Sequence, residues 1–300
     1  MAVYHTPVML DESLHALNIK TNGIYADLTF GGGGHSSSIL KSLKEGRLIS
    51  FDQDLEALAN IPDDKRITPV HGNFRYLSNY FRYLGVEEVD GIIADLGVSM
   101  HQFDAPERGF TYRNDAVLDM RMNNSSDITA ANVLNSYSVE QLSGIFIKYA
   151  DIHFARRLAV SILKYRESMP FKTTGQLSEC VSPFCRPNEK NKILSRVFQA
   201  IRIEVNNEFD ALAEMLPQAT EYLKKGGRLV ILTYHSAEDR IVKNFIKTGN
   251  VEGKEEKDIR GQKADLMLKS LNTKPLIASS GELGKNPAAR SAKLRVAEKI

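Results

Sequence analysis

Short apolar runs recur along the first hundred residues and again toward the C-terminus, and most are followed by a turn and a helix-like segment. The run VDGIIADLGVS is apolar on both faces, as a central strand of a parallel sheet is. Strands that alternate with helices predict an α/β fold with a mainly parallel sheet. The last two runs are joined by a Gly/Asn/Pro turn and predict a terminal hairpin, whereas the polar segment 249–272 predicts a loop. The predicted strands lie at 24–27, 47–54, 67–74, 89–99, 226–236, 274–280 and 289–299.

Between the fourth and fifth predicted strands the apolar spacing becomes helical. In the segment 154–165 apolar residues recur every three or four positions, which is the stripe of an amphipathic helix. The segment 197–216 has the same spacing and predicts one helix that leads into the fifth strand. We therefore expect a helical insertion at 106–200 within a sheet domain built from 1–105 and 201–300.

The stretch IYADLTFGGGGH at 24–35 ends a predicted strand in four consecutive glycines, directly before a helix-like segment. A strand, a glycine turn and a helix start form the place where doubly wound α/β proteins bind phosphates and nucleosides. A dinucleotide site would need a third glycine where Ser36 stands, and the acid Asp27 favours a nucleoside carrying an amine or a sulfonium. The alternative is a turn without a ligand, although four glycines in a row are costly in chain entropy.

Acidic residues end three of the predicted strands: Asp27, Asp52 and Asp95. Asp52 lies 21 residues after Gly31, where an acid accepts hydrogen bonds from ribose hydroxyls in both NAD and S-adenosylmethionine enzymes. The alternative for Asp52 is an acid at a helix N-terminus. Phe74, after the third strand, could cover an adenine ring. Because ligands of open α/β sheets bind beyond the carboxyl ends of the strands, three acids there predict a ligand site.

Ser236 and Asp239 follow the fifth predicted strand with the spacing of a capping box for the next helix. His235 and Glu238 are not explained by that capping box. They stand at the carboxyl end of a strand, so we expect them to contact a ligand.

The bulk composition narrows the class of protein. Of 300 residues 42% are hydrophobic and 25% charged, which is typical of a soluble globular protein of one large or two small domains. No apolar run approaches the roughly 18 residues that span a membrane, and the N-terminus carries no secretion signal. Cys180 and Cys185 match no zinc-ligand pair, and the seven histidines show no metal-binding spacing. We predict a cytoplasmic protein with reduced thiols, no membrane association and no metal.

The net charge of +2 is unevenly distributed. From Arg156 to Arg202 there are ten basic and three acidic residues, a net of +7, and the remainder is acidic. Such a block indicates a polyanionic partner, with a solvated helix face as the alternative. Gln199, Arg202 and Asn206 form a polar helix stripe that is either solvent surface or lines a substrate site at the seam with the sheet domain. The last predicted strand is also basic, with Arg290, Lys293 and Arg295.

Eight motifs spread over nearly the whole chain are long and unusual enough to be specific together. They are HTPVML (5–10), DLTFGGGGHS (27–36), DLGVS (95–99), RGFTYRND (108–115), LDMRM (118–122), FQAIRIEVNNE (198–208), HSAEDRIVK (235–243) and NPAARSAKLRV (286–296). With these motifs the chain resembles the ribosomal RNA small subunit methyltransferase H family, whose members methylate the exocyclic N4 of a cytidine in the decoding region of 16S rRNA. The resemblance implies a Rossmann-like class I methyltransferase sheet of seven strands with a terminal antiparallel hairpin and an inserted helical domain for substrate recognition.

The resemblance also implies S-adenosylmethionine as cofactor and 16S rRNA as partner, within the small ribosomal subunit or a late assembly particle. Two segments depart from the family pattern: KYADIHFARR (148–157) replaces a YGEE-like stretch, and CRPNEKNKILSRV (185–197) lacks a usual His-Pro pair. Both lie in the predicted insertion, so they concern the RNA contacts. The family's cofactor contacts match these residues of the chain: Gly33, Gly34, His35, Asp52, Phe74, Asp95 and Gln102.

The implied reaction transfers a methyl group in line from a sulfonium to N4 of cytosine, whose lone pair is delocalised into the ring. A carboxylate that accepts an N4–H hydrogen bond would favour a pyramidal amine and screen the developing positive charge. Asp95 is the predicted catalytic residue, beside its match to a cofactor contact. The base must leave the RNA stack, and the loop after the fourth strand offers aromatic residues to stack on it, with packing between the domains as the alternative. These aromatic residues are Phe103, Phe110 and Tyr112.

Two other functions compete with methyl transfer. A nicotinamide-dependent oxidoreductase would use the same glycine turn and Asp52, but the missing third glycine counts against it. A non-catalytic RNA-binding assembly factor would keep the fold without methyl transfer, and the three acids at the strand ends count against it.

Overall fold

The computed structural model describes residues 7–255 and 266–300. The chain divides into two compact units, one that runs up to Gly97 and resumes at Phe209, and one that spans Val98–Glu208. We call them the sheet unit and the helical unit. The boundaries predicted at 106 and 200 both fall inside the helical unit, because short helical segments begin soon after Gly97 and a long helix runs past residue 200.

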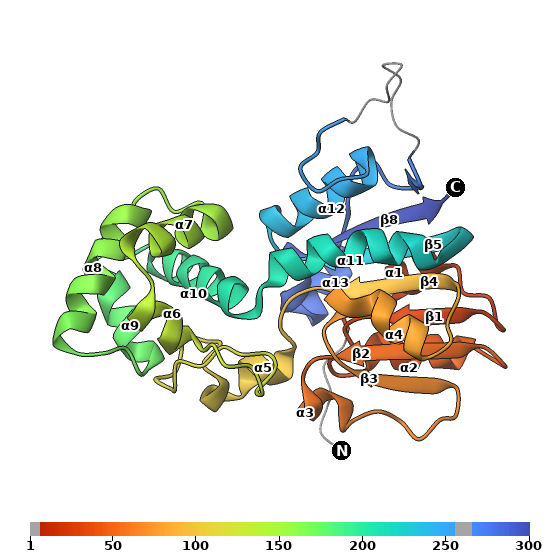
Figure 1. The fold of residues 1–300 in the computed structure, drawn as a ribbon, viewed down its shortest axis with the longest axis horizontal. Helices are drawn as coiled ribbons and strands as arrows, with labels where there is room; N and C mark the ends of the chain where they lie inside the picture. The colour runs from red at the N-terminus through yellow and green to blue at the C-terminus, as the bar shows by residue number, and fades with distance from the viewer. Residues whose placement is uncertain (1–6, 256–265) are drawn as a thin grey trace. The chain divides into compact units, whose positions relative to one another are not determined.

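In the described residues the sheet unit holds one sheet of eight strands in the order β3-β2-β1-β4-β5-β8-β6, with β7 also paired to β8 (Figure 1). Strands β1 to β5 are parallel, and β8 runs antiparallel to β5, β6 and β7. The strands are β1 (Ile24–Asp27), β2 (Arg47–Asp52), β3 (Ile67–His71), β4 (Val89–Asp95), β5 (Leu223–Thr233), β6 (Leu268–Ser270), β7 (Leu276–Ile277) and β8 (Lys293–Lys299).

The predicted α/β class and the antiparallel pairing of the last two predicted strands are confirmed, but two helical segments, Ser280–Lys285 and Pro287–Ser291, replace the predicted turn between them. The predicted number of seven strands is wrong by one. Strand β6 lies at the end of the segment 249–272 that the sequence predicted as a loop. It has three residues, two of them exposed, so it lacks the apolar run by which the longer strands were recognised. Residues 256–265 of the predicted loop lie outside the described residues.

Helices cover both faces of the sheet, so the sheet unit has three layers. Along β4, Ile92 packs into the core beneath α4, α11 and α12, whereas its neighbour Ile93 packs into the core beneath α1, α2 and α3. This double burial explains why β4 is apolar on both faces. The helices of the sheet unit are α1 (Leu10–Leu17), α2 (Gly34–Ser42), α3 (Leu55–Leu58), η1 (Phe74–Tyr76), α4 (Leu77–Tyr83), α11 (Glu208–Tyr222), α12 (Ser236–Thr248), α13 (Ser280–Lys285) and η4 (Pro287–Ser291).

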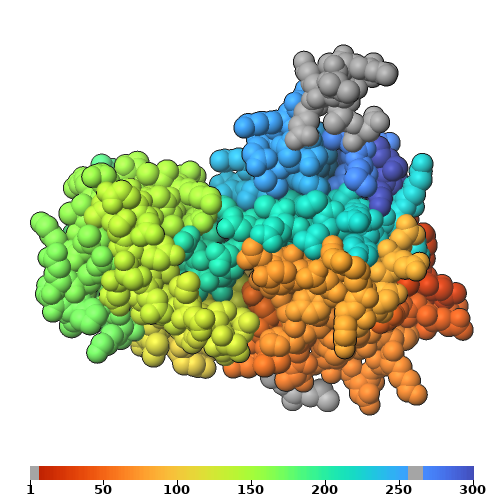
Figure 2. Space-filling view, viewed as in Figure 1, coloured from red at the N-terminus to blue at the C-terminus, as the bar shows by residue number. Residues whose placement is uncertain are grey.

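The N-terminal third and the C-terminal third of the chain build this unit together. Figure 2 shows the red-to-orange and the teal-to-blue segments of the sheet unit packed against each other. The pairing of β4 with β5 joins the two parts, and Asp95 of β4 pairs with Leu232 of β5 in register. The carboxyl end of β5 therefore lies beside the carboxyl end of β4.

The helical unit is built around α7, α8 and α10. The apolar stripe predicted at 154–165 is confirmed, since Leu158 and Ile162 of α8 are fully buried. The helices of this unit are α5 (Met100–Asp104), η2 (Pro106–Arg108), α6 (Ala130–Ser136), α7 (Val139–Ala150), α8 (Ala155–Ser168), α9 (Thr174–Val181), η3 (Ser182–Phe184) and α10 (Lys190–Asn206).

The single helix predicted at 197–216 is two helices, α10 and α11, separated at Asn207. Asn207 has φ 49° and ψ 39°, a left-handed conformation that ends a helix and that asparagine tolerates better than most residues. The apolar spacing of four residues continues from Val205 to Phe209 across the break, so the pattern alone did not reveal it.

Helix α12 begins at Ser236, and its N-cap is His235, whose Nδ1 accepts the N–H of Glu238 at 3.3 Å. The predicted capping box of Ser236 and Asp239 is therefore wrong by one position. Glu238 also accepts the N–H of Tyr234 at 3.0 Å. Capping thus explains His235 and Glu238, which the sequence had assigned to ligand contact.

Asp239 is instead half of a buried ion pair that joins α12 to β8. Its two carboxylate oxygens accept hydrogen bonds from the Arg295 guanidinium at 2.6 and 3.2 Å, and Lys293 Nζ lies 3.5 Å away. Burial opposes the ionisation of Asp239, but Arg295 and Lys293 outweigh it and lower the pKa of the carboxyl. The basic character of the last strand therefore serves the fold at these two positions.

We expect Arg295→Met to lower the free energy of unfolding by about 3–5 kcal/mol, because it leaves the Asp239 carboxylate buried without a full partner. Combining it with Asp239→Asn should restore part of the loss. Arg290→Met, which changes an exposed arginine nearby, is the control and should change stability by less than about 0.5 kcal/mol. Urea unfolding of the three variants checks this, and equal losses for Arg290 and Arg295 would contradict it.

Candidate functional site

The turn between β1 and α2 carries the four glycines. Gly31 and Gly33 have φ of 52° and 75°, which glycine adopts at little cost. A Cβ on Gly33 would lie 2.7 Å from Phe30 Cζ, and one on Gly34 would lie 2.6 Å from Pro7 Cγ. Gly33 is the N-cap of α2 and has no side chain to cap it, so the first N–H groups of the helix remain available to a ligand.

Asp52 ends β2 and ties it to this turn. One carboxylate oxygen accepts the N–H of Gly31 at 2.8 Å, and the other accepts the N–H of Asp54 at 2.9 Å. Burial raises the pKa of Asp52 to about 6, against the opposing effect of these two hydrogen bonds. The helix N-cap in this segment is Asp54 and not Asp52, so the alternative reading of Asp52 as a helix-terminal acid is wrong. Each oxygen keeps a lone pair for a further donor.

Asp27 ends β1 but has its partners inside the protein. Only 1% of the residue is exposed. One oxygen accepts the N–H of Thr29 at 3.1 Å, and the other accepts the hydroxyl of Ser36 at 2.7 Å, which also contacts the Ser50 hydroxyl at 2.8 Å. Asp27 therefore stabilises the glycine turn from below, and the expectation that it favours a particular ligand is not supported by its position.

Asp95 ends β4, between β1 and β5. Its backbone N–H donates to the Thr29 hydroxyl at 2.7 Å, which joins β4 to the glycine turn. Its Oδ2 lies 3.9 Å from Nδ1 of His35, and 23% of the Asp95 side chain is exposed. Burial raises the pKa of Asp95, while the nearby His35 acts in the opposite direction. His35 itself is buried, with Nε2 at 3.2 Å from the Val8 carbonyl, so Nε2 carries a proton.

Tyr234 belongs to this site although the sequence did not single it out. Its phenol donates a hydrogen bond to Asp95 Oδ1 at 2.6 Å. It stands directly after β5, next to His235, which was selected for its strand-end position. The strand-end position of Tyr234 was the sequence feature that could have indicated a role, but an aromatic residue after a buried strand is common. The hydroxyl of Tyr234 reaches an acid only because β4 and β5 are adjacent in the sheet.

Acids at the amino and carboxyl ends of the parallel strands have different partners. At the amino end of β4 the buried Asp90 accepts hydrogen bonds from Lys20 Nζ at 2.9 Å and Lys224 Nζ at 3.0 Å. At the carboxyl edge, neither Asp52 nor Asp95 is paired with a lysine or an arginine of the described residues. Partly buried carboxylates without a cation are unfavourable in a structural role and are typical of a binding or catalytic site.

The structure brings most of the predicted cofactor residues to one edge of the sheet unit. The glycine turn, Asp52 and Asp95 follow the adjacent strands β1, β2 and β4, and Phe74 begins η1 after the edge strand β3. Phe74 is partly buried and packs against the core. Gln102 belongs to the helical unit, where its side chain completes a capping box with Ser99 at the start of α5.

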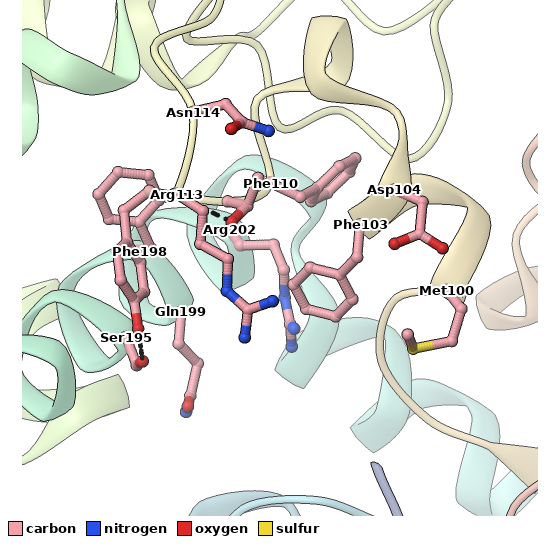
Figure 3. Close-up of a pocket in the computed structure, with 12 residues that line it drawn as sticks. Met100, Phe103, Asp104, Phe110, Arg113, Asn114, Ser195, Phe198, Gln199 and Arg202 are labelled. Atoms are coloured by element: carbon pink, nitrogen blue, oxygen red, sulfur yellow. Dashed lines mark hydrogen bonds between the residues drawn. The ribbon is translucent and has the colours of Figure 1, made fainter. Parts of the chain in front are cut away.

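The helical unit contains a pocket of about 470 Å³ of its own (Figure 3). It is lined by α5, the loop 110–114 and α10. The three aromatic residues predicted to stack on a base all line it, but they differ in exposure. Phe110 is 4% exposed, and the Tyr112 ring packs edge-on against Phe198 with centroids 5.6 Å apart. Phe103 is 39% exposed, so among the three it has the freest ring face.

The polar stripe predicted on α10 serves two purposes within this unit. Asn206 is structural, since it donates to the Met120 carbonyl and accepts the Met122 N–H. Gln199 and Arg202 line the pocket and extend in the same direction as Arg113 (Figure 3). Arg202 is engaged by Glu208 in two hydrogen bonds of 2.7 and 2.8 Å, whereas the exposed Arg113 has no carboxylate partner among the described residues.

The basic block of the helical unit also divides into two groups. Arg166 donates to two backbone carbonyls, Arg196 to one, and Arg202 to Glu208, so these three serve the fold. The other seven are exposed: Arg156, Arg157, Lys164, Lys172, Arg186, Lys190 and Lys192. Exposed acids are fewer in this segment, namely Glu167, Glu179 and Glu189, so the surface formed by 156–202 has an excess of positive charge.

Two general searches complete the description of residues 7–255 and 266–300. No helix in these ranges is both long and apolar enough to cross a membrane. In the same ranges no group of three or more His, Cys, Asp or Glu side chains is placed to hold a metal ion.

Comparison with known proteins identifies the family. The family model described as the MraW methylase family matches residues 2–300. A protein of Parabacteroides distasonis named ribosomal RNA small subunit methyltransferase H is 51% identical over 299 residues, which cover 99% of this chain and 98% of that protein. One of Phocaeicola vulgatus with the same name is 52% identical over 298 residues, with coverage of 99% and 98%.

Among solved structures, an rRNA methylase from Streptococcus thermophilus matches 100% of this chain and 99% of its own with a TM-score of 0.42 and 12% identity, a likeness too weak to indicate function. The family model and the relatives confirm the resemblance that the eight motifs carry. The chain belongs to the MraW methylase family.

Proposed function

We propose that this protein transfers a methyl group from S-adenosylmethionine to the exocyclic N4 of a cytidine in the decoding region of 16S rRNA. The observation that carries the proposal is the pair of partly buried carboxylates, Asp52 and Asp95, that no lysine or arginine of the described residues neutralises. Relatives about 50% identical over the whole chain are named for the RNA of the small ribosomal subunit, which supports that substrate. Membership in a methylase family argues against the nicotinamide oxidoreductase.

The carboxyl edge of the sheet fits the cofactor. When bound, S-adenosylmethionine supplies an electrophilic methyl group on a sulfonium. The free lone pairs of Asp52 suit the ribose hydroxyls, and Phe74 suits the adenine. Gly33, Gly34 and His35 begin α2, whose uncapped N–H groups suit the carboxylate of the amino-acid portion. Gln102 is part of the proposed contact set on the strength of the family resemblance.

Asp95 would act on the target amine. Its Oδ2 accepts no hydrogen bond from the described residues, so it is free to accept one from the N4–H of cytosine. That hydrogen bond favours a pyramidal nitrogen with a localised lone pair and screens the positive charge that develops on it. The same oxygen can take the proton that the amine loses after methylation.

The helical unit would bind the RNA. The seven exposed lysines and arginines between Arg156 and Lys192 provide a surface for phosphates. The pocket of this unit combines an exposed ring, Phe103, with the guanidinium of Arg113, which has no carboxylate partner among the described residues. The two suit the stacked base and the phosphate of a single-stranded nucleotide. The substrate is 16S rRNA within the small subunit or a late assembly particle, and the enzyme acts in the cytoplasm.

We expect Asp52→Ala to weaken the binding of S-adenosylhomocysteine by about 1.5–3 kcal/mol, because two charge-assisted hydrogen bonds are lost. In the wild-type protein the affinity should fall as the pH decreases through about 6, where Asp52 takes a proton and loses its charge. Asp52→Asn should remove this pH dependence. Calorimetry between pH 5.5 and 8 checks both expectations.

The control for these binding measurements is Asp63→Asn, which changes an exposed acid in the same unit and should keep the wild-type affinity. Because Asp52 also holds the Gly31 N–H, thermal unfolding must be recorded beside the binding. Unchanged affinity in Asp52→Ala would rule out the ribose assignment.

We expect wild-type protein to place one methyl group on N4 of a decoding-region cytidine when small subunits from cells without this modification are supplied. Asp95→Asn should lower the single-turnover rate more than tenfold, because the amide lacks the negative charge. The thermal midpoint should barely move, since the amide oxygen still accepts from Tyr234. Mass spectrometry of RNA fragments locates the methyl group. RNA binding without methyl transfer would favour the assembly factor instead.

We expect Arg156→Gln, Arg157→Gln and Lys164→Gln together to flatten the salt dependence of particle binding by about two units. The reason is that each neutralised phosphate contributes about 0.7 to the slope on single strands. The triple variant Lys41, Lys44 and Lys65→Gln removes the same charge from exposed positions of the sheet unit and should leave the slope unchanged. If both triple variants show the same salt dependence, Arg156, Arg157 and Lys164 do not contact phosphates and form an ordinary solvent-exposed helix face.

A further inference from the structure

Tyr234 is fixed at both its backbone and its side chain. Its N–H donates to Glu238 at 3.0 Å, and its phenol donates to Asp95 Oδ1 at 2.6 Å. A Cβ on Gly97 would lie 3.9 Å from Tyr234 Cδ2, so the turn after β4 passes beside the ring. Gly97 has φ 104°, a conformation that other residues rarely adopt. The sheet unit therefore holds this phenol in one place against one acid.

The two oxygens of Asp95 are consequently not equivalent. Oδ1 is occupied by the phenol, whereas Oδ2 has no hydrogen bond from the described residues and lies 3.9 Å from His35 Nδ1. The Asp95 side chain is 23% exposed, at the edge where ligands of such sheets bind. A tyrosine and an aspartate that served packing alone would not need an oxygen left open at this edge.

We propose that Tyr234 is a positioning residue for the methyl transfer: by holding Asp95 Oδ1 it presents Oδ2 as the oxygen that accepts a hydrogen from the target amine. This inference rests on the function proposed above. A carboxylate held at one oxygen cannot turn about its Cβ–Cγ bond, so the amine hydrogen and the nitrogen lone pair keep one orientation. Orientation of this kind accounts for large rate factors in enzymes.

The same hydrogen bond favours the ionised form of Asp95. Burial raises the pKa of Asp95, as do the nearby acids Asp27 and Glu238, whereas the nearby His35 and the hydrogen bond from Tyr234 oppose that rise. Burial, together with the negative charge of Asp95, raises the pKa of Tyr234 far above its ordinary value, so the phenol stays a donor at any working pH. Losing the phenol hydroxyl should therefore raise the pKa of Asp95, and the enzyme should need a higher pH to be active.

The test compares Tyr234→Phe with Tyr222→Phe. Tyr222 lies in the same unit, and among the described residues its hydroxyl donates only to the Ser78 carbonyl, at 3.4 Å. Tyr222→Phe is therefore a matched loss of one phenol hydroxyl. Single-turnover methylation of unmodified small subunits is measured from pH 5.5 to 9 with saturating S-adenosylmethionine. We expect Tyr234→Phe to lower the plateau rate about tenfold or more, and to move the acid limb of the profile to higher pH. Tyr222→Phe should match wild type in both.

A second measurement does not depend on activity. The side-chain carboxyl carbons of ¹³C-labelled aspartates are titrated by NMR, and the Asp95 signal is assigned by its absence in Asp95→Asn. We expect this signal to titrate at higher pH in Tyr234→Phe than in wild type. The affinity for S-adenosylhomocysteine should stay within about twofold, because the phenol is not placed among the cofactor contacts.

The outcomes separate the two proposals. An unmoved Asp95 titration and an unmoved acid limb would overturn the role of Tyr234, whatever happens to the plateau rate. A lower thermal midpoint with an unchanged pH profile would make Tyr234 structural and would also overturn it. The Asp95 titration could shift in Tyr234→Phe while the wild-type protein methylates no RNA. That result would support the coupling of Tyr234 to Asp95 and would contradict the proposed function.

Discussion

Partly buried negative charge at the carboxyl edge of the sheet is the constraint around which the rest of the sheet unit is arranged. Taking a carboxylate out of water is unfavourable unless donors replace the lost solvent. Here neutral groups replace it: backbone N–H groups at Asp52, a serine hydroxyl at Asp27 and a phenol at Asp95. Asp90, at the opposite edge, takes two lysines instead. The carboxyl ends of the strands therefore hold acids without a lysine or arginine partner among the described residues, which suits the cationic sulfonium of S-adenosylmethionine.

The strand order turns this local constraint into a site. Strands β2, β1, β4 and β5 are neighbours, so residues far apart in sequence end at one edge. The glycine turn after β1 is hydrogen-bonded to the strands on both sides of β1. The Gly31 N–H donates to the Asp52 carboxylate of β2, and the Thr29 hydroxyl accepts the backbone N–H of Asp95 of β4. A change in either acid would thus act on the turn as well as on a ligand, which is why binding and stability have to be measured together.

Charged side chains are distributed differently in the two units. The sheet unit has acids without a lysine or arginine partner at the carboxyl ends of its strands, and the helical unit exposes seven cations against three acids between Arg156 and Arg202. Between Arg156 and Arg202, three arginines donate to backbone carbonyls or to Glu208, so the number of basic residues in this segment overstates the number available to a polyanion. A protein that must hold a sulfonium in one place and phosphates in another needs this separation, because opposite fields at one site would cancel.

The sequence by itself determined the parallel sheet, the glycine turn and the acids at the strand ends, because apolar run length, φ preference and strand-end position are local properties. The same local rules missed the three-residue strand β6 and the helix break at Asn207, where the apolar spacing continues. Only the tertiary structure decided that Asp27 is enclosed while Asp95 keeps one oxygen open, and that Tyr234 holds the other. Burial and hydrogen-bond partners depend on which strands are neighbours. Tyr234 and Asp95 are 139 residues apart, a separation over which no local pattern carries information.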